Sequence, residues 1–180
     1  MILFLMLMMV LILMTACTKS SEEKEITNAT GFFRIYDDVE SLYSMASVVV
    51  SGTVIETSVK WLDDMLDPGD PTDEKSNPGG ERIHAEQIYT VHQFKIENVY
   101  KGEWNRAEII EVKQIGGEKD NKLLVVENIS YLEEDKEYLL FLETYEKSPA
   151  SLLNPIQGMY EIKDEKMGIR IIVWKTPINR

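Results

Sequence analysis

The sequence contains only one cysteine and two histidines in 180 residues, which limits the chemistry available to it. A single thiol cannot form an intramolecular disulfide, so the folded part must be stabilised by packing alone. The two histidines, His84 and His92, do not have the His-Glu-x-x-His spacing of a zinc enzyme. The Gly-x-Ser-x-Gly motif of a serine hydrolase is also missing. These absences favour a binding protein over an enzyme, and we expect no bound cofactor.

Positive charge is also scarce, with 19 lysines and arginines against 31 aspartates and glutamates. The first 17 residues carry no charged side chain, so the net charge of -12 belongs to the remainder. A strongly acidic surface repels phosphate groups, which argues against nucleic acid as a partner. It also disfavours a molecule that lies flat on an anionic lipid leaflet. Basic proteins, cations and neutral ligands remain compatible with this charge.

No hydrophobic run reaches the length of a comfortable membrane span, which needs about 20 residues. The run Ile2–Met14 has thirteen apolar residues and matches the apolar core of a secretory signal peptide. Thr15 and Ala16 are small, and the only cysteine, Cys17, follows them. The sequence Met-Thr-Ala-Cys resembles a bacterial lipobox, in which a peptidase cleaves before a cysteine that carries a diacylglyceryl group. We therefore predict a signal peptide over residues 1–16, cleavage between Ala16 and Cys17, and lipid attachment at Cys17.

Two features depart from the lipobox pattern. Met14 stands where leucine is the commonest residue, and no lysine or arginine precedes the apolar run. A start codon further upstream would supply the missing charge. The alternatives are a single-span signal anchor and an apolar segment with an incidental cysteine. In the lipoprotein interpretation, residues 17–35 form a flexible tether, because the stretch after Cys17 is polar and lacks periodicity.

The remainder, residues 36–180, has the pattern of one short helix followed by several strands. Asp37–Ala46 has apolar residues at helical spacing, and Asp37 with Glu40 resembles a capping box. Alternating and β-branched stretches predict strands over residues 47–59, 87–102, 107–117, 122–128 and 137–145, and a late hairpin formed by 158–163 and 169–174.

Several of these strands carry signals of bending. Gly52 interrupts the first strand, and a break in the alternation predicts a bulge at Glu97 or Asn98. Residues 62–86 are rich in Asp, Pro and Gly and are predicted to form a long acidic loop. The most economical arrangement is a small, closed or nearly closed antiparallel barrel, because closure removes exposed strand edges.

The order of these segments resembles a group of small exported proteins of Gram-positive bacteria, many of them lipoproteins. The resemblance lies in ASVVVSGTV, FKIENVYKG, IIEVKQIGG, YLEEDKEYLLFLE and IQGMYEI, and it covers residues 37–163. It implies a mainly β, OB-like barrel with some likeness to the domain shared by netrins and metalloproteinase inhibitors. Those inhibitors act through a disulfide-bonded N-terminal cysteine placed against a metal. Since Cys17 has no partner cysteine and would carry lipid, that inhibitory mechanism does not transfer to this chain.

Few residues are candidates for binding a metal or another cation. His92 lies on the mostly apolar face of its strand, where a buried structural histidine is the common case. His84 lies at the edge of the acidic loop and could contribute to a metal site. Within the loop, Asp67, Asp70 and Asp73 could bind calcium, although their spacing of three differs from the alternation of an EF-hand loop.

Two tryptophans, Trp61 and Trp104, lie near strand ends, where aromatic side chains either anchor a partner or cover the core. We interpret the chain as a lipid-anchored binding or interaction module on the extracytoplasmic face of the cell membrane, with an unidentified protein or small molecule as partner. The rival hypothesis is a metal-dependent enzyme or cation-binding protein that uses His84, His92 and loop carboxylates. A passive envelope protein is the third possibility.

Overall fold

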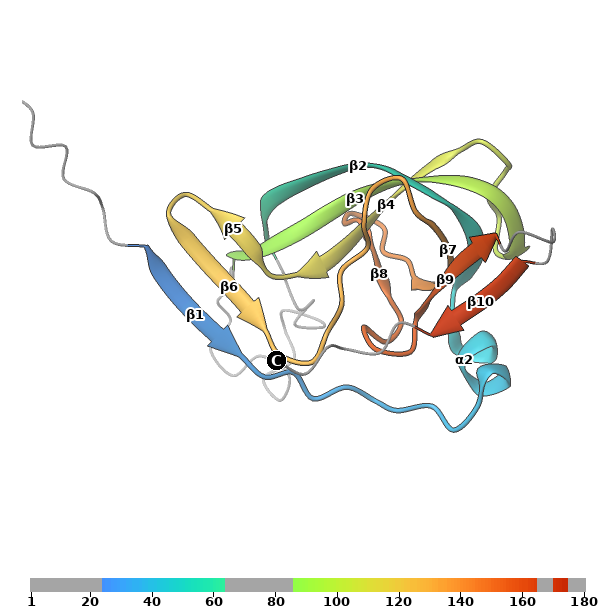
Figure 1. Cartoon of the computed structure of the whole chain (residues 1–180), viewed down its shortest axis with the longest axis horizontal. Coiled ribbons are helices and arrows are strands. Elements are labelled where there is room, and N and C mark those ends of the chain that lie inside the picture. The colour runs from blue at the N-terminus through green and yellow to red at the C-terminus, as the bar shows by residue number, and fades with distance from the viewer. Residues whose placement is uncertain (1–23, 64–85, 165–169, 175–180) are drawn as a thin grey trace, which may run out of the picture.

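The structure is a computed structural model that describes residues 24–63, 86–164 and 170–174 (Figure 1). These residues are mostly strands with one short helix, so the predicted mainly β class is confirmed. In chain order the elements are β1 (Glu25–Ala29), α2 (Val39–Met45), β2 (Val48–Asp63), β3 (Glu86–Lys101), β4 (Ile109–Ile115), β5 (Gly117–Lys119), β6 (Lys122–Val126), β7 (Glu137–Glu143), β8 (Ala150–Leu152), β9 (Met159–Asp164) and β10 (Arg170–Trp174).

Five strands of the larger sheet close into a ring. β2 lies between β3 and β7, β4 pairs with the other edge of β3, and β8 pairs with both β4 and β7. The β4–β8 pairing is parallel, with Val112 opposite Ala150, and the other pairs of the ring are antiparallel. A small five-stranded barrel with such crossed connections is OB-like. The predicted barrel is therefore confirmed, with one parallel pair that the sequence did not reveal.

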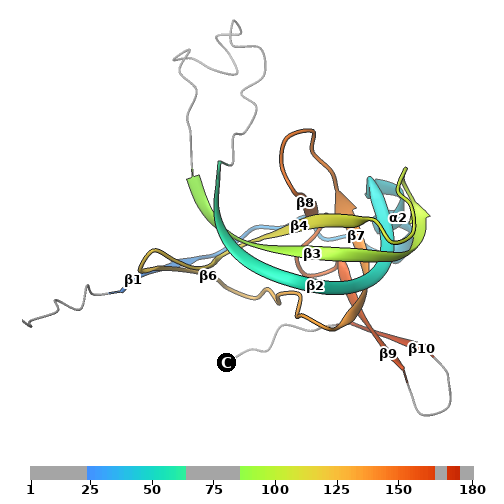
Figure 2. The same ribbon diagram turned by 90° about the horizontal axis from the view of Figure 1, so that it is seen from above.

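The two longest strands, β2 and β3, curve around the barrel (Figure 2) because their pairing shifts register at several points. Gly52 pairs with Ile96, whereas the residue before Gly52 pairs with Asn98. Glu97 is therefore the extra residue of a bulge, at the position predicted from the sequence. Glycine is required at residue 52, since a Cβ atom there would lie 2.0 Å from the Lys95 carbonyl oxygen.

The core lies inside the ring. On β4, Ile110 and Val112 are buried and alternate with the exposed Ile109. β7 is flanked by β2 on one edge and by β8 and β9 on the other, and its Tyr138 and Leu140 are fully buried. β7, which lies within the strand predicted over residues 137–145, is therefore a central strand of the sheet.

Residues 127–136, which we call the plug segment, cover one end of the barrel between β6 and β7. Leu132 of this segment is 3% exposed and packs into the barrel core. Gln114 on β4 holds the segment with both ends of its amide. Its Nε2 donates to the Ser130 carbonyl oxygen at 2.9 Å, and its Oε1 accepts from the Leu132 N–H at 2.8 Å. A buried amide that is satisfied in this way specifies one position for the segment.

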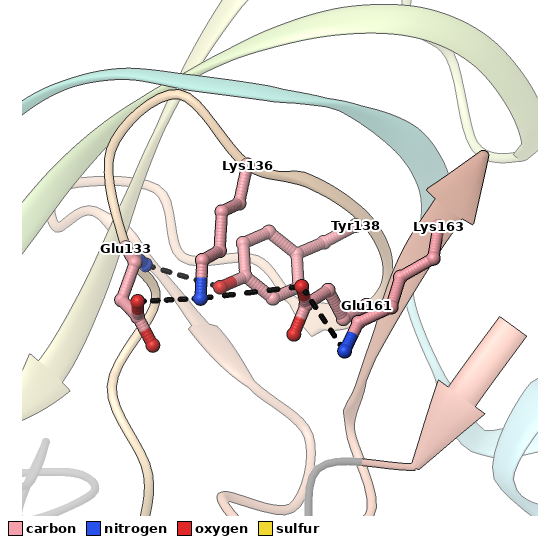
Figure 3. Close-up of polar contacts among 5 residues, drawn as sticks. All are labelled: Glu133, Lys136, Tyr138, Glu161 and Lys163. Atoms are coloured by element: carbon pink, nitrogen blue, oxygen red, sulfur yellow. Dashed lines mark hydrogen bonds and ion pairs between the residues drawn. The ribbon is translucent and has the colours of Figure 1, made fainter. Parts of the chain in front are cut away.

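Tyr138 fixes the C-terminal part of the plug segment (Figure 3). Its hydroxyl oxygen accepts a hydrogen bond from the Glu133 N–H at 3.2 Å, and burial raises the pKa of Tyr138 to about 12. Lys136 Nζ lies 2.5 Å from Glu133 Oε2 and 4.0 Å from Glu161 Oε1, and Lys163 Nζ lies 3.7 Å from the same Glu161 oxygen. Because the lysines are exposed, we expect each ion pair to contribute less than about 1 kcal/mol.

Helix α2 packs on the outside of β2 and β7. Leu42 and Ala46 are buried there against neighbours that include Phe141, in agreement with the predicted apolar face. Val39 and Tyr43, which the helical spacing placed on the same face, are 54% and 41% exposed. The helix therefore buries a narrower stripe than the sequence predicted.

The N-terminal cap of α2 differs from the prediction by one residue. Asp38, not Asp37, is the cap, and its Oδ1 accepts a hydrogen bond from the Ser41 N–H at 2.7 Å. This hydrogen bond lowers the pKa of Asp38. Because the two aspartates are adjacent, spacing alone does not choose between them. Lys101 at the end of β3 donates to the Ser44 carbonyl oxygen in the last turn of the helix, where a positive charge suits the dipole.

Part of the predicted tether, residues 17–35, is regular structure. β1 pairs in parallel with β6, from Glu25 opposite Lys122 to Ala29 opposite Val126. Together with β5 these strands form a second, three-stranded sheet, which packs on residues of β2, β3 and β4. The tether prediction is corrected for these residues. A short polar strand shows no local alternation signal, and its partner lies far away in the sequence.

The turn after β8 holds the segment between β1 and α2. Asn154 is 1% exposed, and its Nδ2 donates to the Arg34 carbonyl oxygen at 2.5 Å. Its Oδ1 accepts from the N–H groups of Ile156 and Gln157, both at 2.7 Å. Gln157 in turn accepts from the Tyr36 N–H and donates to the Tyr36 carbonyl oxygen, both at 2.8 Å. We call Asn154 and Gln157 the amide clamp.

Two other predicted segments, the acidic loop and the late hairpin, have parts that lie within the described residues. The acidic loop was predicted over residues 62–86, but Leu62 and Asp63 belong to β2 and Glu86 belongs to β3. Residues 64–85 lie outside the described residues. β9 and β10 form the predicted late hairpin, with Asp164 opposite Arg170.

Candidate binding face

Most of the site residues predicted from the sequence lie outside the described residues. These are Ala16 and Cys17 of the lipidation site, and His84, Asp67, Asp70 and Asp73 of the candidate cation site. What the sequence predicts for them stays a prediction. His92 is described, and it lies in β3.

His92 is fully buried on the inward face of β3, as predicted for a structural histidine. Its Nδ1 lies 3.1 Å from Thr57 Oγ1 on β2, and its Nε2 has no hydrogen-bond partner among the described residues. Burial lowers the pKa of His92 to about 4, and the nearby Gln114 amide and Glu134 charge oppose this effect only in part. The imidazole is therefore neutral at neutral pH.

The described residues around His92 supply no further ligands for the predicted metal-dependent site, whose other members, His84 and the loop carboxylates, lie outside the described residues. Within residues 24–63, 86–164 and 170–174, no three His, Cys, Asp or Glu side chains are grouped so that they could hold a metal ion. A fully buried imidazole also cannot meet a solvent-borne substrate unless the barrel opens. We interpret His92 as part of the packing below the plug segment.

A different cluster lies on the outer face of β3 and β4 around Lys113. Lys113 is only 7% exposed, and its ammonium group lies 5.0 Å from the ring centroids of both Tyr89 and Tyr145. It donates a hydrogen bond to Ser148 Oγ at 3.0 Å. Tyr145 is held in turn by its hydroxyl group, which lies 2.8 Å from Ser151 Oγ. Each cation–π contact contributes about 0.5–2 kcal/mol, depending on how far the cation is desolvated.

The strand register explains how this cluster forms. Lys113 pairs with Val91 on β3, and Tyr89 is the next residue of β3 on the same face. The loop between β7 and β8, residues 144–149, brings Tyr145 and Ser148 over this face. We call the outer face of β3 and β4, together with this loop, the binding face.

An ion pair spans one part of the binding face. Lys60 Nζ on β2 lies 2.9 Å from Glu111 Oε1 on β4. Since β2 and β4 flank β3, this pair crosses β3 and helps to cover Val91, which is 1% exposed. Both side chains are more than 40% exposed, so the pair contributes little to stability and serves to orient Glu111.

Next to the Lys113 cluster the surface forms an open pocket of about 370 Å³. Trp104, Ile110 and Ala150 give it an apolar part, while Glu111 and Lys147 bring charges of opposite sign. The remaining lining residues come from the β7–β8 loop, namely Thr144, Tyr145, Ser148 and Pro149. The volume is in the lower part of the range of small-molecule sites, about 300–1,000 Å³. It suits a small molecule or a few residues of a peptide.

The sequence singled out only Trp104 among these residues. Trp104 packs against the core, as one of its two predicted roles requires, and it also lines the pocket; its role as an anchor for a partner stays a prediction. Trp61, the other candidate tryptophan, lies on β2, is partly buried and packs against the cluster beneath the small sheet, as predicted for a residue that covers the core. The sequence gives no sign of the cluster formed by Lys113, Tyr145 and Ser148. A lysine in an alternating strand is typical of a solvent-exposed face, so Lys113 does not stand out. Only the strand register and the path of the loop bring them together.

No helix within the described ranges is long and apolar enough to cross a membrane. Comparison of the chain with protein-family models, with curated proteins and with solved structures finds no match. Function is therefore inferred from the residues and geometry of this chain.

Proposed function

We propose that this protein is a lipid-anchored binding module displayed on the extracytoplasmic face of the cell membrane. The observation that carries the binding function is the pocket of about 370 Å³ beside the Lys113 cluster. The pocket is lined by apolar residues together with two charged side chains, Glu111 and Lys147, and ligand sites commonly combine such groups. The OB-like topology supports this proposal, since such barrels bind ligands on one strand face and its adjoining loops.

The charge of the chain favours a neutral or basic polypeptide segment as the ligand. A net charge of -12 repels anionic molecules over the distance of a Debye length, about 8–10 Å. Glu111 at the pocket border offers a carboxylate to a basic side chain. Trp104 and Tyr145 offer aromatic surface for apolar groups of the same segment.

Trp104 allows pocket occupancy to be measured directly, because it lines the pocket. In a variant with Trp61→Phe and Trp174→Phe, the remaining emission is titrated with three peptides of equal length that are basic, neutral or acidic. We expect saturable changes with the basic and neutral peptides and none with the acidic peptide. Glu111→Gln should lower the affinity for the basic peptide about tenfold, because the variant loses one charge-assisted hydrogen bond.

Glu40→Gln on α2 is the matched control, because it removes the same charge outside the pocket. We expect it to leave the affinity for the basic peptide almost unchanged. If all three peptides leave the Trp104 emission unaltered, the proposed ligand class is wrong.

The lipid anchor is proposed from the apolar run Ile2–Met14 and the small residues before Cys17. Each buried methylene of an acyl chain contributes about 0.8 kcal/mol, so that two chains give stable attachment where one is marginal. Growth on labelled fatty acid should label the wild-type protein and leave Cys17→Ala unlabelled. Equal labelling of both proteins would exclude Cys17 as the attachment point.

A further inference from the structure

The small sheet of β1, β6 and β5 has one face that the barrel does not cover. Its inner face packs on the barrel through Leu124 and Val126, which are buried. The opposite face carries Ile26, Leu123 and Val125, since the parallel register places Ile26 opposite Leu123. Ile26 is 59% exposed and Val125 is 38% exposed. We call these three residues the outer sheet face.

The charge of this sheet differs from that of the whole molecule. Lys24, the three strands and the turn between β5 and β6 contain three lysines and three acidic residues, so their net charge is zero, whereas the chain has -12. Lys24 Nζ lies 2.7 Å from Glu118, and Lys122 Nζ lies 3.3 Å from Glu25. The repulsion that keeps most of this acidic molecule away from an anionic leaflet is therefore weak at this sheet.

The position of the sheet adds an independent constraint. β1 and the β5–β6 hairpin form one end of the molecule, and α2 lies toward the opposite end (Figures 1 and 2). Seven residue steps separate Cys17 from Lys24, and a chain spans at most about 3.6 Å per residue. A lipid on Cys17 therefore keeps Lys24 within about 25 Å of its point of attachment. Since β1 is paired with β6, this short connection constrains the orientation of the whole folded part.

We propose that the outer sheet face rests on the headgroup region of the bilayer in which the lipid is inserted. This inference builds on the proposed anchoring at Cys17. Ile26 and Val125 place apolar side chains among the headgroups, and Lys24, two residues before Ile26, offers an ammonium group to lipid phosphates. In this orientation α2 and the connection between β3 and β4, which carries the pocket residue Trp104, point away from the membrane.

The test uses the full lipidated chain in vesicles of equal parts phosphatidylglycerol and phosphatidylethanolamine that contain a lipid with a headgroup-attached fluorescence quencher. A fluorophore is attached to Val125→Cys, since Cys17 carries lipid and leaves only the introduced thiol reactive. Val39→Cys on α2 is the matched control, because it is also an exposed valine but lies toward the opposite end. We expect quenching at residue 125 to exceed that at residue 39 several-fold.

The outcomes separate this inference from the anchor on which it depends. Equal quenching at residues 125 and 39, in protein that sediments with the vesicles, overturns the inference and leaves the anchor intact. If the wild-type chain sediments no better than Cys17→Ala, the anchor itself is refuted. If the label at residue 125 responds to protein density but not to the lipid quencher, the sheet is a surface for self-association and the inference is wrong.

Discussion

At the scale of single residues, three buried polar side chains, Gln114, Asn154 and His92, differ in how well their hydrogen bonds are satisfied. Gln114 and Asn154 use both ends of their amides and connect segments far apart in the chain. His92 differs from them, because its Nε2 has no hydrogen-bond partner among the described residues. A buried, unsatisfied polar atom costs about 1–3 kcal/mol. Protonation of this imidazole costs more, since the charge would have to be buried as well.

The stability of the protein should therefore fall as the pH is lowered from 6.5 toward 4. The unfolded chain binds a proton at His92 near its ordinary pKa of 6.5, whereas the folded chain does so only near 4. Between these two pKa values proton binding favours the unfolded state. The free energy of unfolding therefore falls by about 1.4 kcal/mol per pH unit, and by about 3 kcal/mol in total. Urea unfolding at a series of pH values measures this dependence.

His92→Gln is the matched control, because a glutamine cannot titrate. We expect its stability to change less than that of the wild type between pH 6.5 and 4. Proton NMR supplies a second measurement on the wild type, with His84→Gln to assign the two imidazole signals. A His92 resonance that titrates near pH 6.5 would contradict the structural explanation.

At the scale of elements, the sequence predicts those features that depend on neighbouring residues. The break in the pattern of β3 predicts a bulge at Glu97 or Asn98, and the structure has it at Glu97. β1 and the plug segment were missed because partners distant in the sequence hold them. Gln114 makes two hydrogen bonds to the plug segment, and no local sequence pattern predicts such a contact.

The amide clamp is another element of this kind, and its removal should loosen the segment that it holds. Gln157→Ala removes both hydrogen bonds to Tyr36, so the chain between β1 and α2 should exchange its amide hydrogens faster. We expect a loss of about 1–3 kcal/mol in local stability. Hydrogen exchange read by mass spectrometry measures this change. Gln87→Ala, at an exposed position of β3, is the matched control and should leave exchange in this segment unchanged.

At the scale of the whole molecule, strand connections that the sequence does not reveal create the candidate site. The parallel pairing of β4 with β8 brings the β7–β8 loop against β4, so that Tyr145 and Ser148 reach Lys113. The sequence predicts a barrel and an aromatic residue near a turn, Trp104, but not this juxtaposition. The predicted cation site at His84 depends on residues outside the described ranges and stays a prediction.

The same connections divide the molecule into two packed units. The barrel core includes Leu140, which is fully buried, whereas the small sheet is held by a separate cluster that includes Leu124. β1 is exposed along most of its length and adds little apolar contact to this cluster. We therefore expect the amides of β1 and β6 to exchange through a local opening of lower free energy than the global unfolding that exposes β2 and β7.

Two matched substitutions test this division. Leu140→Ala creates a cavity in the barrel and should lower the free energy of global unfolding by about 2–5 kcal/mol. Leu124→Ala should lower the free energy of opening at β1 and β6 and leave that of β2 and β7 nearly unchanged, because Leu124 belongs to a cluster separate from the barrel core. Native-state hydrogen exchange measures both free energies in one experiment. If Leu124→Ala lowers the protection of β2 and β7 as much as that of β6, the two sheets unfold as one cooperative unit and the division is wrong.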